Sequence, residues 1–216
     1  MGELNRGQWV KPSTITPRET PPGLQILADL DTIAVHQQVE VIELATNFET
    51  ENKYNILNPD RYQQILYAQE QSDYCNRICC GDTRAFEMGI YNVRNEEILH
   101  LTRYKRCQCC IYFCCLQKME VFAPAGNLLG TIKQLWDFCY PKFVVKDNEG
   151  KALFKISGPC CVFGTVNFPV TSAQNGEDIG TIQKKWGGWG TEAFTDADVF
   201  GIDFKQDLSV EVIYEI

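Results

Sequence analysis

The sequence predicts an all-β fold in which about twelve antiparallel strands close into a barrel. Short runs of alternating apolar residues recur along the chain, separated by clusters rich in Asn, Asp and Gly, which is the pattern of consecutive hairpins. An open sheet of so many strands would leave long unpaired edges, and closure into a barrel removes them. The length of 216 residues and the hydrophobic content of 44% suit one domain with a sizeable core.

The chain divides into a short tail and one folded domain. Residues 1–22 hold four of the nine prolines and show no apolar periodicity, so we expect a flexible N-terminal tail. The barrel domain is expected to occupy residues 23–216. At its start we predict a short helix passing into a strand that runs to Glu43, from the apolar residues Leu24, Ile26, Leu27, Leu30, Ile33 and Val35.

Hairpins follow in order along the domain. The clearest hairpin joins residues 142–146 to residues 152–156. Both runs are rich in β-branched and aromatic residues, and they flank the turn at 147–150. Further strand pairs are predicted at 54–57 with 65–68, 86–93 with 98–102, and 119–123 with 130–135. The connecting turns at 58–60, 94–96, 124–127, 147–150 and 175–177 contain residues that tolerate the positive φ of tight connections.

Charge and hydropathy exclude several classes of protein. The 20 Lys and Arg against 28 Asp and Glu give a net charge of −8, which disfavours nucleic acid as a partner. The longest uninterrupted apolar run, 109–116, is too short to span a bilayer. The N-terminus lacks the apolar core of a secretion signal, and Arg6 stands where myristoylation requires Ser or Thr, so neither export nor a myristoyl anchor is expected.

The cysteines point to lipid modification. There are eleven, an odd number, and without an export signal we expect a reducing compartment in which thiols serve acylation, metal binding or burial. The densest group, directly after Arg103, Lys105 and Arg106, contains Cys107, Cys109, Cys110, Cys114 and Cys115. Adjacent thiols among bulky apolar residues and beside cations favour S-acylation, because such a loop contacts the bilayer while the cations meet anionic headgroups.

Two other interpretations of the cysteines stay open. A zinc or iron–sulfur site would combine Cys75, Cys79 and Cys80 with members of the denser group. Zinc is disfavoured, because vicinal cysteines are awkward joint ligands for one tetrahedral ion. The remaining interpretation is that the thiols are buried and inert.

An acidic segment, residues 196–207, has the spacing of a calcium-binding loop. Asp196, Asp198 and Asp207 occupy positions 1, 3 and 12 of an EF-hand loop, Gly201 occupies position 6, and position 7 would add a backbone carbonyl. Phe200 and Phe204 stand at positions 5 and 9, where oxygen ligands are usual, so only weak calcium binding is expected. The alternative, slightly favoured by the pattern, is a β-strand with Phe200, Ile202 and Phe204 facing the core.

No enzyme motif is present. The sequence lacks the patterns of phosphate-binding loops, zinc proteases and serine hydrolases, and His36 and His100 lie in alternating strands where a structural role is favoured. The basic and aromatic stretch at 184–189 could contact a headgroup or a nuclear importer, which allows a minor nuclear pool, but a solvated turn with core tryptophans is favoured. We therefore expect no chemical catalyst.

Several motifs in series resemble one family. They are Pro-Pro-Gly-Leu at 21–24, His-Gln-Gln-Val-Glu at 36–40, Phe-Glu-Thr at 48–50, Asn-Lys-Tyr at 52–54, the cysteine group continuing into 116–117, Pro-Lys-Phe at 141–143, Lys-Ile-Ser-Gly-Pro-Cys at 155–160, and Glu-Ala-Phe-Thr-Asp-Ala-Asp at 192–198 with Phe-Gly-Ile at 200–202. From about residue 21 to residue 208 the chain closely resembles the phospholipid scramblases.

The resemblance implies a Tubby-like fold, a twelve-stranded barrel around a central apolar helix, and calcium-dependent movement of phospholipids between the plasma-membrane leaflets. It implies palmitoylation of Cys107, Cys109, Cys110, Cys114 and Cys115, and attachment at the cytoplasmic face. The family's calcium segment corresponds to Asp196, Asp198, Phe200, Ile202, Phe204 and Asp207.

The sequence also departs from the family. It ends at Ile216, before the family's central helix, so we expect a barrel without that helix. Covalent palmitate and weakly bound calcium are the expected cofactors, and a phospholipid membrane with anionic headgroups is the expected partner. The alternative function is a palmitoylated adaptor module that binds signalling proteins and transports no lipid. The sequence makes no prediction of oligomeric state.

Overall fold

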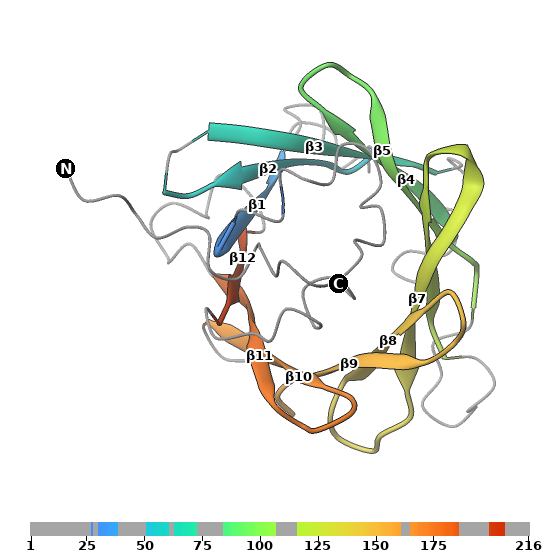
Figure 1. Ribbon diagram of the computed structural model, residues 1–216, viewed down its shortest axis with the longest axis vertical. Helices are drawn as coiled ribbons and strands as arrows, with labels where there is room; N and C mark the ends of the chain where they lie inside the picture. Colours follow the sequence, from blue (N-terminus) through green and yellow to red (C-terminus); the bar gives the residue numbers. More distant parts are fainter. Residues whose placement is uncertain are drawn as a thin grey trace, which may run out of the picture.

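The computed structural model describes residues 27, 30–38, 51–60, 63–72, 84–106, 116–160, 165–185 and 199–205, and these residues form a closed antiparallel barrel (Figure 1). The order around the barrel is β1-β12-β11-β10-β9-β8-β7-β6-β5-β4-β3-β2, so each strand pairs with its neighbours in sequence and β1 pairs with β12. The predicted fold class is confirmed. The strands are β1 (Thr32–Gln38), β2 (Lys53–Asn58), β3 (Gln63–Gln71), β4 (Phe86–Asn92), β5 (Glu97–Arg103), β6 (Lys118–Ala123), β7 (Asn127–Leu135), β8 (Lys142–Asp147), β9 (Ala152–Ser157), β10 (Val166–Ser172), β11 (Asp178–Lys185) and β12 (Val199–Phe204).

The predicted hairpins are confirmed in their pairing. The pairs β2 with β3, β4 with β5, β6 with β7 and β8 with β9 are the four predicted from sequence. Their turns use the expected residues: Asn95 has φ 62°, and Gly126, Gly150 and Gly176 have φ between 74° and 86°. Only residues that tolerate the left-handed region fit these positions without strain, so the turn chemistry fixes where each hairpin reverses.

Two local predictions are refined by the structure. Along the first apolar stretch the strand begins at Thr32, so Ile33 and Val35 lie in β1, while Leu27 is helical. Lys184 and Lys185 are the last two residues of β11 and not part of a turn, because both pair with β12. The predicted flexible tail at 1–22, the end of the first strand near Glu43 and the expected absence of a central helix after 207 lie outside the described residues.

The inner face of the barrel is mainly apolar. One row of paired positions that runs across six strands shows this, since its members are apolar apart from one lysine. Neighbouring positions across six strands are Leu66, Ile56, Val35, Phe200, Lys184 and Val166. Asp203, Thr181 and Pro169 form another row on β12, β11 and β10, three residues along each strand, and by alternation face the other side of the sheet. Lys184 is accommodated because its Nζ lies 5.6 Å from the centre of the Phe200 ring, a cation–π contact.

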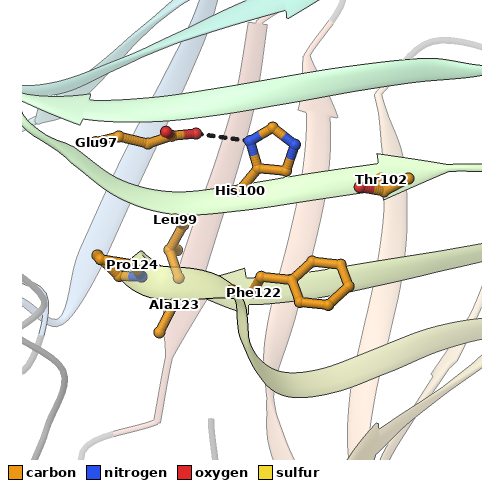
Figure 2. Close-up of a pocket in the computed structure, with 8 residues that line it drawn as sticks. Glu97, Leu99, His100, Thr102, Phe122, Ala123 and Pro124 are labelled. Carbon is orange, nitrogen blue, oxygen red and sulfur yellow. Dashed lines mark hydrogen bonds and ion pairs between the residues drawn. The ribbon is translucent and has the colours of Figure 1, made fainter.

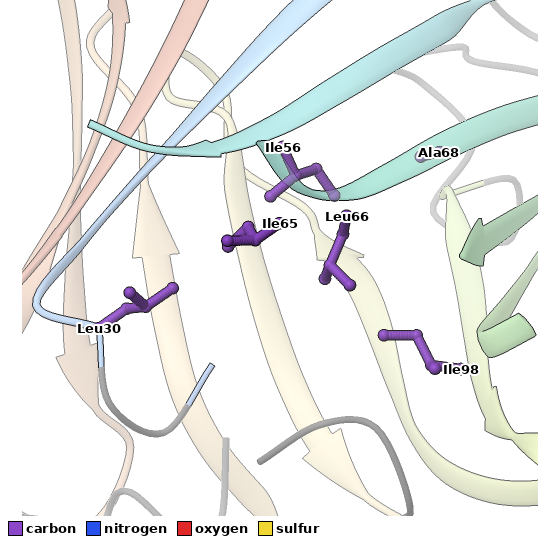
Figure 3. Close-up of a cluster of buried hydrophobic side chains, with 6 residues drawn as sticks. All are labelled: Leu30, Ile56, Ile65, Leu66, Ala68 and Ile98. Carbon is purple, nitrogen blue, oxygen red and sulfur yellow. The ribbon is translucent and has the colours of Figure 1, made fainter. Parts of the chain in front are cut away.

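Two apolar clusters fill opposite parts of this interior. Leu30, Ile56, Ile65, Leu66, Ala68 and Ile98 form the first, and Figure 3 shows Ile56, Ile65 and Leu66 side by side. The second contains Leu153, Phe154 and Ile179, with Phe204 packed against it. Burying an aliphatic side chain of this size stabilises the fold by roughly 1.5–3 kcal/mol, so these clusters supply the core expected from the alternating pattern.

One buried ion pair interrupts the apolar interior. Glu70 on β3 is 1% exposed, and its carboxylate accepts hydrogen bonds from Arg84 Nε at 2.8 Å and Arg84 Nη2 at 2.9 Å. Asn52 Nδ2 donates a further bond of 2.6 Å to Glu70, and Gln37 Nε2 donates to Asn52 Oδ1 at 2.8 Å. Burial raises the pKa of Glu70, but the hydrogen bonds from Arg84 and Asn52 outweigh it, so the pKa lies below its ordinary value. The carboxylate is therefore held charged inside the barrel.

Candidate functional site

The two ends of the barrel differ in the connections they carry. Because neighbouring strands are antiparallel, connections alternate between the ends. One end, the short-turn end, carries the connections 59–62, 93–96, 124–126, 148–151 and 173–177. The other, the long-loop end, carries 39–52, 72–85, 104–117, 136–141, 158–165 and 186–198. All eleven cysteines fall within these long connections, and none falls in a short turn. The topology therefore assigns every thiol to connections that leave and re-enter the barrel at one end.

The predicted acylation loop has a clamped base. Residues 107–115 lie outside the described part, but the residues on either side of them are hydrogen-bonded to each other. Gln117 Nε2 donates to the Arg106 carbonyl at 3.0 Å, and Arg106 Nη1 donates to the Leu116 carbonyl at 3.3 Å. Arg103 Nε donates to Gln117 Oε1 at 3.2 Å. These bonds hold the start and finish of the cysteine segment together, so the chain leaves and returns at one place on the rim.

The next strand fixes this base. Gln117 N donates to Gln134 Oε1 at 3.1 Å, and Gln134 N donates back to the Gln117 carbonyl at 2.8 Å. Since Gln134 lies in β7, the base of the cysteine loop is tied to the barrel wall on its β7 side as well as to β5 and β6. The guanidinium of Arg103 also stacks on Phe86 of β4, 5.5 Å from the ring centre.

Charged groups beside the base are paired. Lys118 Nζ donates to Glu120 Oε1 at 2.7 Å, and the Tyr104 hydroxyl donates to Glu120 Oε2 at 3.0 Å. The Lys118 and Tyr104 hydrogen bonds lower the pKa of Glu120, and the same carboxylate raises the pKa of Tyr104. Tyr104 keeps its proton and Glu120 its charge, so the two remain a stable donor and acceptor next to the loop.

The clamp makes a specific prediction. We expect Gln117→Ala to speed amide hydrogen exchange at 103–106 and 116–118, because it removes the side-chain bonds to both Arg103 and Arg106. The free energy of unfolding should fall by about 1–2 kcal/mol. Exchange followed by mass spectrometry checks this, with Tyr104→Phe as the control, since it removes only the exposed bond to Glu120. Exchange at wild-type rates in Gln117→Ala would show that the side chain does not hold the loop base.

The predicted calcium segment is a strand where the structure describes it. Val199–Phe204 is β12, paired with β1 on one side and β11 on the other, which confirms the strand interpretation for these residues. Phe200, Ile202 and Phe204 share one face, while Asp203 is exposed on the other. Asp196, Asp198 and Asp207 lie outside the described residues, so calcium binding stays a prediction.

The strand separates the two parts of the calcium segment. The chain enters β12 from Asp196 and Asp198, in the connection at the long-loop end, and leaves it toward Asp207. A strand of six residues is about 17 Å long. As an inner strand of the ladder, β12 has neighbours for its backbone carbonyls on either side. Of the three carboxylates in the predicted calcium segment, those of Asp196 and Asp198 therefore belong to a connection at the same end of the barrel as the cysteine loop, and that of Asp207 does not.

Sequence inspection missed the aromatic connection between β7 and β8. In residues 136–141, Phe138 is 88% exposed, Tyr140 49% and Trp136 47%. Cys139, between two of these rings, is an exposed free thiol. The predicted strands at 130–135 and 142–146 already left these residues in a connection, but the sequence did not show that the aromatic rings in it are exposed.

A shallow surface pocket lies away from this end. It has a volume of about 340 Å³ and is lined by residues of β5, β6 and the β6–β7 turn, including Leu99, Phe122 and Pro124 (Figure 2). His100, predicted to be structural, lies on β5 with Nδ1 2.7 Å from Glu97 Oε1. His36 lies in β1.

Within the described ranges, no three His, Cys, Asp or Glu side chains gather closely enough to hold a metal ion. Cys75, Cys79 and Cys80, the thiols of the alternative metal site, lie outside those ranges. In the part of the chain that the structure places, no helical segment has the length and apolar character that crossing a bilayer requires.

Comparison with known proteins gives a consistent result. A family model described as scramblase matches residues 11–213. Human phospholipid scramblase 1 is 42% identical over 207 residues, which cover 94% of this chain and 64% of the relative. Human phospholipid scramblase 2 is 42% identical over 208 residues, covering 94% and 69%, and human phospholipid scramblase family member 5 is 38% identical over 205 residues, covering 93% and 75%. The chain thus spans just under two thirds of phospholipid scramblase 1. No solved structure matches it significantly.

Proposed function

The chain belongs to the phospholipid scramblase family, and from this premise we propose that it moves phospholipids between the two leaflets of a membrane. The observation that carries the proposal is the extent of the similarity, which includes all twelve strands of the barrel. A protein of this kind lowers the barrier to headgroup passage and breaks no covalent bond, which agrees with the absence of an enzyme motif in the sequence.

We further propose that the protein is held at the cytoplasmic face of the plasma membrane by palmitate on Cys107, Cys109, Cys110, Cys114 and Cys115. Support comes from the clamped loop base and from Lys105 and Arg106 beside it, since cations next to an acylated loop meet anionic headgroups. One acyl chain gives only reversible attachment, whereas two or more give a stable anchor at about 0.8 kcal/mol per buried methylene. Five thiols in one loop are more than sufficient.

Calcium is the proposed regulator, bound weakly by the acidic segment. Carboxylates are the ligands calcium prefers, and Asp196 and Asp198 belong to a connection at the same end of the barrel as the cysteine loop. A cation held there would reduce the repulsion between the protein's acidic side chains and anionic lipid headgroups. Phe200, Ile202 and Phe204 have no side-chain oxygen to bind calcium, so their role would be to hold the segment in place as residues of the strand.

Reconstitution tests transport and its calcium dependence together. The purified chain in liposomes with fluorescent phospholipid should expose inner-leaflet lipid faster than empty vesicles, and calcium should raise the rate. We expect Asp196→Asn with Asp198→Asn to shift the calcium dependence to about tenfold higher concentration, because two of the charged ligands are lost. Asp60→Asn, at the short-turn end, serves as the control. A rate equal to that of empty vesicles, with or without calcium, would contradict transport.

A palmitoylated adaptor without transport is the second candidate. It is favoured by the barrel surface, where exposed residues such as Lys133, Lys155 and Asp203 give the outer face a polar character suited to protein contacts. The same liposome experiment separates the two functions, since an adaptor would associate with the vesicles and leave lipid distribution unchanged. Its partners would be signalling proteins at the membrane.

A further inference from the structure

The connection between β7 and β8 presents a group of exposed aromatic side chains, Trp136, Phe138 and Tyr140, which we name the aromatic tip. Phe138 is 88% exposed and lies between the two amphipathic rings in sequence. Exposed large apolar groups that gather at one place usually mark a surface for protein or membrane contact. The function proposed above assigns no role to these residues.

The tip is held in shape by Asp137. Its Oδ1 accepts backbone hydrogen bonds from Cys139 N at 3.0 Å and Tyr140 N at 2.9 Å, and its Oδ2 lies 2.6 Å from Lys142 Nζ. The Lys142 and backbone bonds lower the pKa of Asp137 to about 2, so the carboxylate stays charged. The positive charge of Lys142 neutralises it, and two backbone amides already have partners. Moving the aromatic rings into an apolar phase therefore requires no desolvation of a net charge or of the two paired backbone amides.

The tip lies beside the cysteine loop. Gln134, two residues before Trp136, forms the two hydrogen bonds that tie Gln117 to β7 at the base of that loop. On the other side, Gly158 N donates to the Pro141 carbonyl at 2.7 Å, which joins the tip to the connection that contains the exposed thiol Cys160. The aromatic tip therefore continues the surface that carries the proposed acylation sites.

The distribution of exposed large apolar residues supports a single contact surface. In the described part of the chain, Tyr104, Trp136, Phe138 and Tyr140 all lie at the long-loop end, and only Val93 lies at the short-turn end. A short sequence repeat extends the pattern. Gly-Thr-Ile occurs at 130–132 in β7 and at 180–182 in β11, and in both places a tryptophan, Trp136 or Trp186, stands four residues after the isoleucine. Two connections at this end thus begin with the same aromatic residue.

We propose that the aromatic tip inserts into the lipid bilayer, with Phe138 entering the acyl boundary and Trp136 and Tyr140 at the level of the headgroups. Trp and Tyr favour this interface because each has an apolar body and a polar group that stays hydrated, whereas Phe gains from full transfer. The tip then orients the barrel with its long-loop end toward the lipid before any thiol is acylated. This inference concerns docking and requires neither acylation nor transport.

Binding of unacylated protein to vesicles tests the insertion. The full chain, produced in bacteria that lack palmitoyl transferases, is mixed with vesicles of phosphatidylcholine and phosphatidylserine, and the bound fraction is measured by sedimentation. We expect Phe138→Ser to lower the partition coefficient by about tenfold, because a large ring no longer enters the apolar phase. Val93→Ser is the matched control: it also removes an exposed apolar side chain, but at the opposite end, and should leave binding within about twofold of wild type.

A second measurement reports depth directly. In a variant whose other tryptophans, Trp9, Trp186 and Trp189, are replaced by Phe, vesicles with brominated acyl chains should quench Trp136 fluorescence. Equal binding by Phe138→Ser and Val93→Ser, with no quenching, would overturn the insertion. Loss of self-association in Phe138→Ser with unchanged vesicle binding would also overturn it, since the tip would then be a protein contact. Neither result depends on the liposome transport assay, so failure here and failure of the proposed function are distinguishable.

Discussion

Replacing Arg84 with Met is expected to lower the free energy of unfolding by about 3–5 kcal/mol, a large part of the stability of an ordinary domain. Glu70 is 1% exposed, and Arg84 supplies two of its hydrogen bonds together with the compensating charge. Without the guanidinium, the barrel must either bury an unpaired carboxylate or protonate it. Asn52 and Ser72 would remain as donors, but neutral donors offset little of the cost of burying a charge.

The effect of pH distinguishes this explanation from simple loss of packing. In the wild type the pKa of Glu70 is below its ordinary value of 4.5, so its stabilising contribution is present above that pH and is lost as the pH falls. In Arg84→Met, burial raises the pKa of Glu70 and is opposed only by the hydrogen bonds from Asn52 and Ser72, so protonation on acidification relieves part of the penalty. The difference in unfolding free energy between variant and wild type should therefore shrink toward pH 4.

Urea denaturation at a series of pH values measures both effects. Lys205→Met is the matched control, because it breaks an ion pair of 2.6 Å with Asp178 in which both side chains are about half exposed. An exposed pair contributes about 0–1 kcal/mol, so this variant should stay near wild type at every pH. A similar loss in both variants, or a constant difference across the pH series, would contradict the assignment of Glu70 as a buried charge.

The second large effect is expected from the cysteine loop. Replacing Cys107, Cys109, Cys110, Cys114 and Cys115 together by Ser should move most of the protein from the membrane fraction to the soluble fraction of cells. The loss of two or more acyl chains removes far more free energy than the aromatic tip supplies, since each chain contributes about 0.8 kcal/mol per buried methylene. Fractionation followed by quantitative blotting measures the change.

Cys139→Ser with Cys160→Ser provides the control for that experiment. Both thiols are exposed and belong to connections at the same end of the barrel, so the double variant removes accessible cysteines without altering residues 107–115. We expect it to fractionate with the membrane as the wild type does. If the variant with all five loop cysteines replaced stayed in the membrane fraction as the wild type does, another part of the molecule would have to attach the protein to the membrane.

Much of the barrel could be predicted from sequence because its signals are local. Asn95 and the glycines at 126, 150 and 176 mark the turns by their tolerance of positive φ, and alternating runs mark the strands between them. Closure into a barrel was predicted because an open sheet of about twelve strands would leave unpaired strand edges. The strand at Val199–Phe204 was predicted as an alternative for the same reason: Phe200, Ile202 and Phe204 alternate with smaller or polar residues.

Features that depend on closure could not be predicted. Glu70 stands on the same face of β3 as Leu66 and Ala68, a hint that it points inward, but its partner Arg84 is fourteen residues away and outside any strand. The aromatic tip lies between two strands predicted from sequence, but the exposure of its rings could not be predicted, and the alternation of connections shows that it shares one end with all eleven cysteines. The end-to-end asymmetry of the barrel is therefore a property of topology.

The central claim is that acyl chains on the cysteine loop hold the long-loop end of the barrel against the membrane. Trypsin cleavage after Arg106 and Lys118 releases residues 107–118, which contain all five cysteines of the loop. Mass spectrometry of this peptide, from protein isolated with cell membranes, should show two or more thioester-linked palmitates, and hydroxylamine should remove them and release the protein. Five unmodified thiols in membrane-bound protein, or protein that hydroxylamine does not release, would contradict the account.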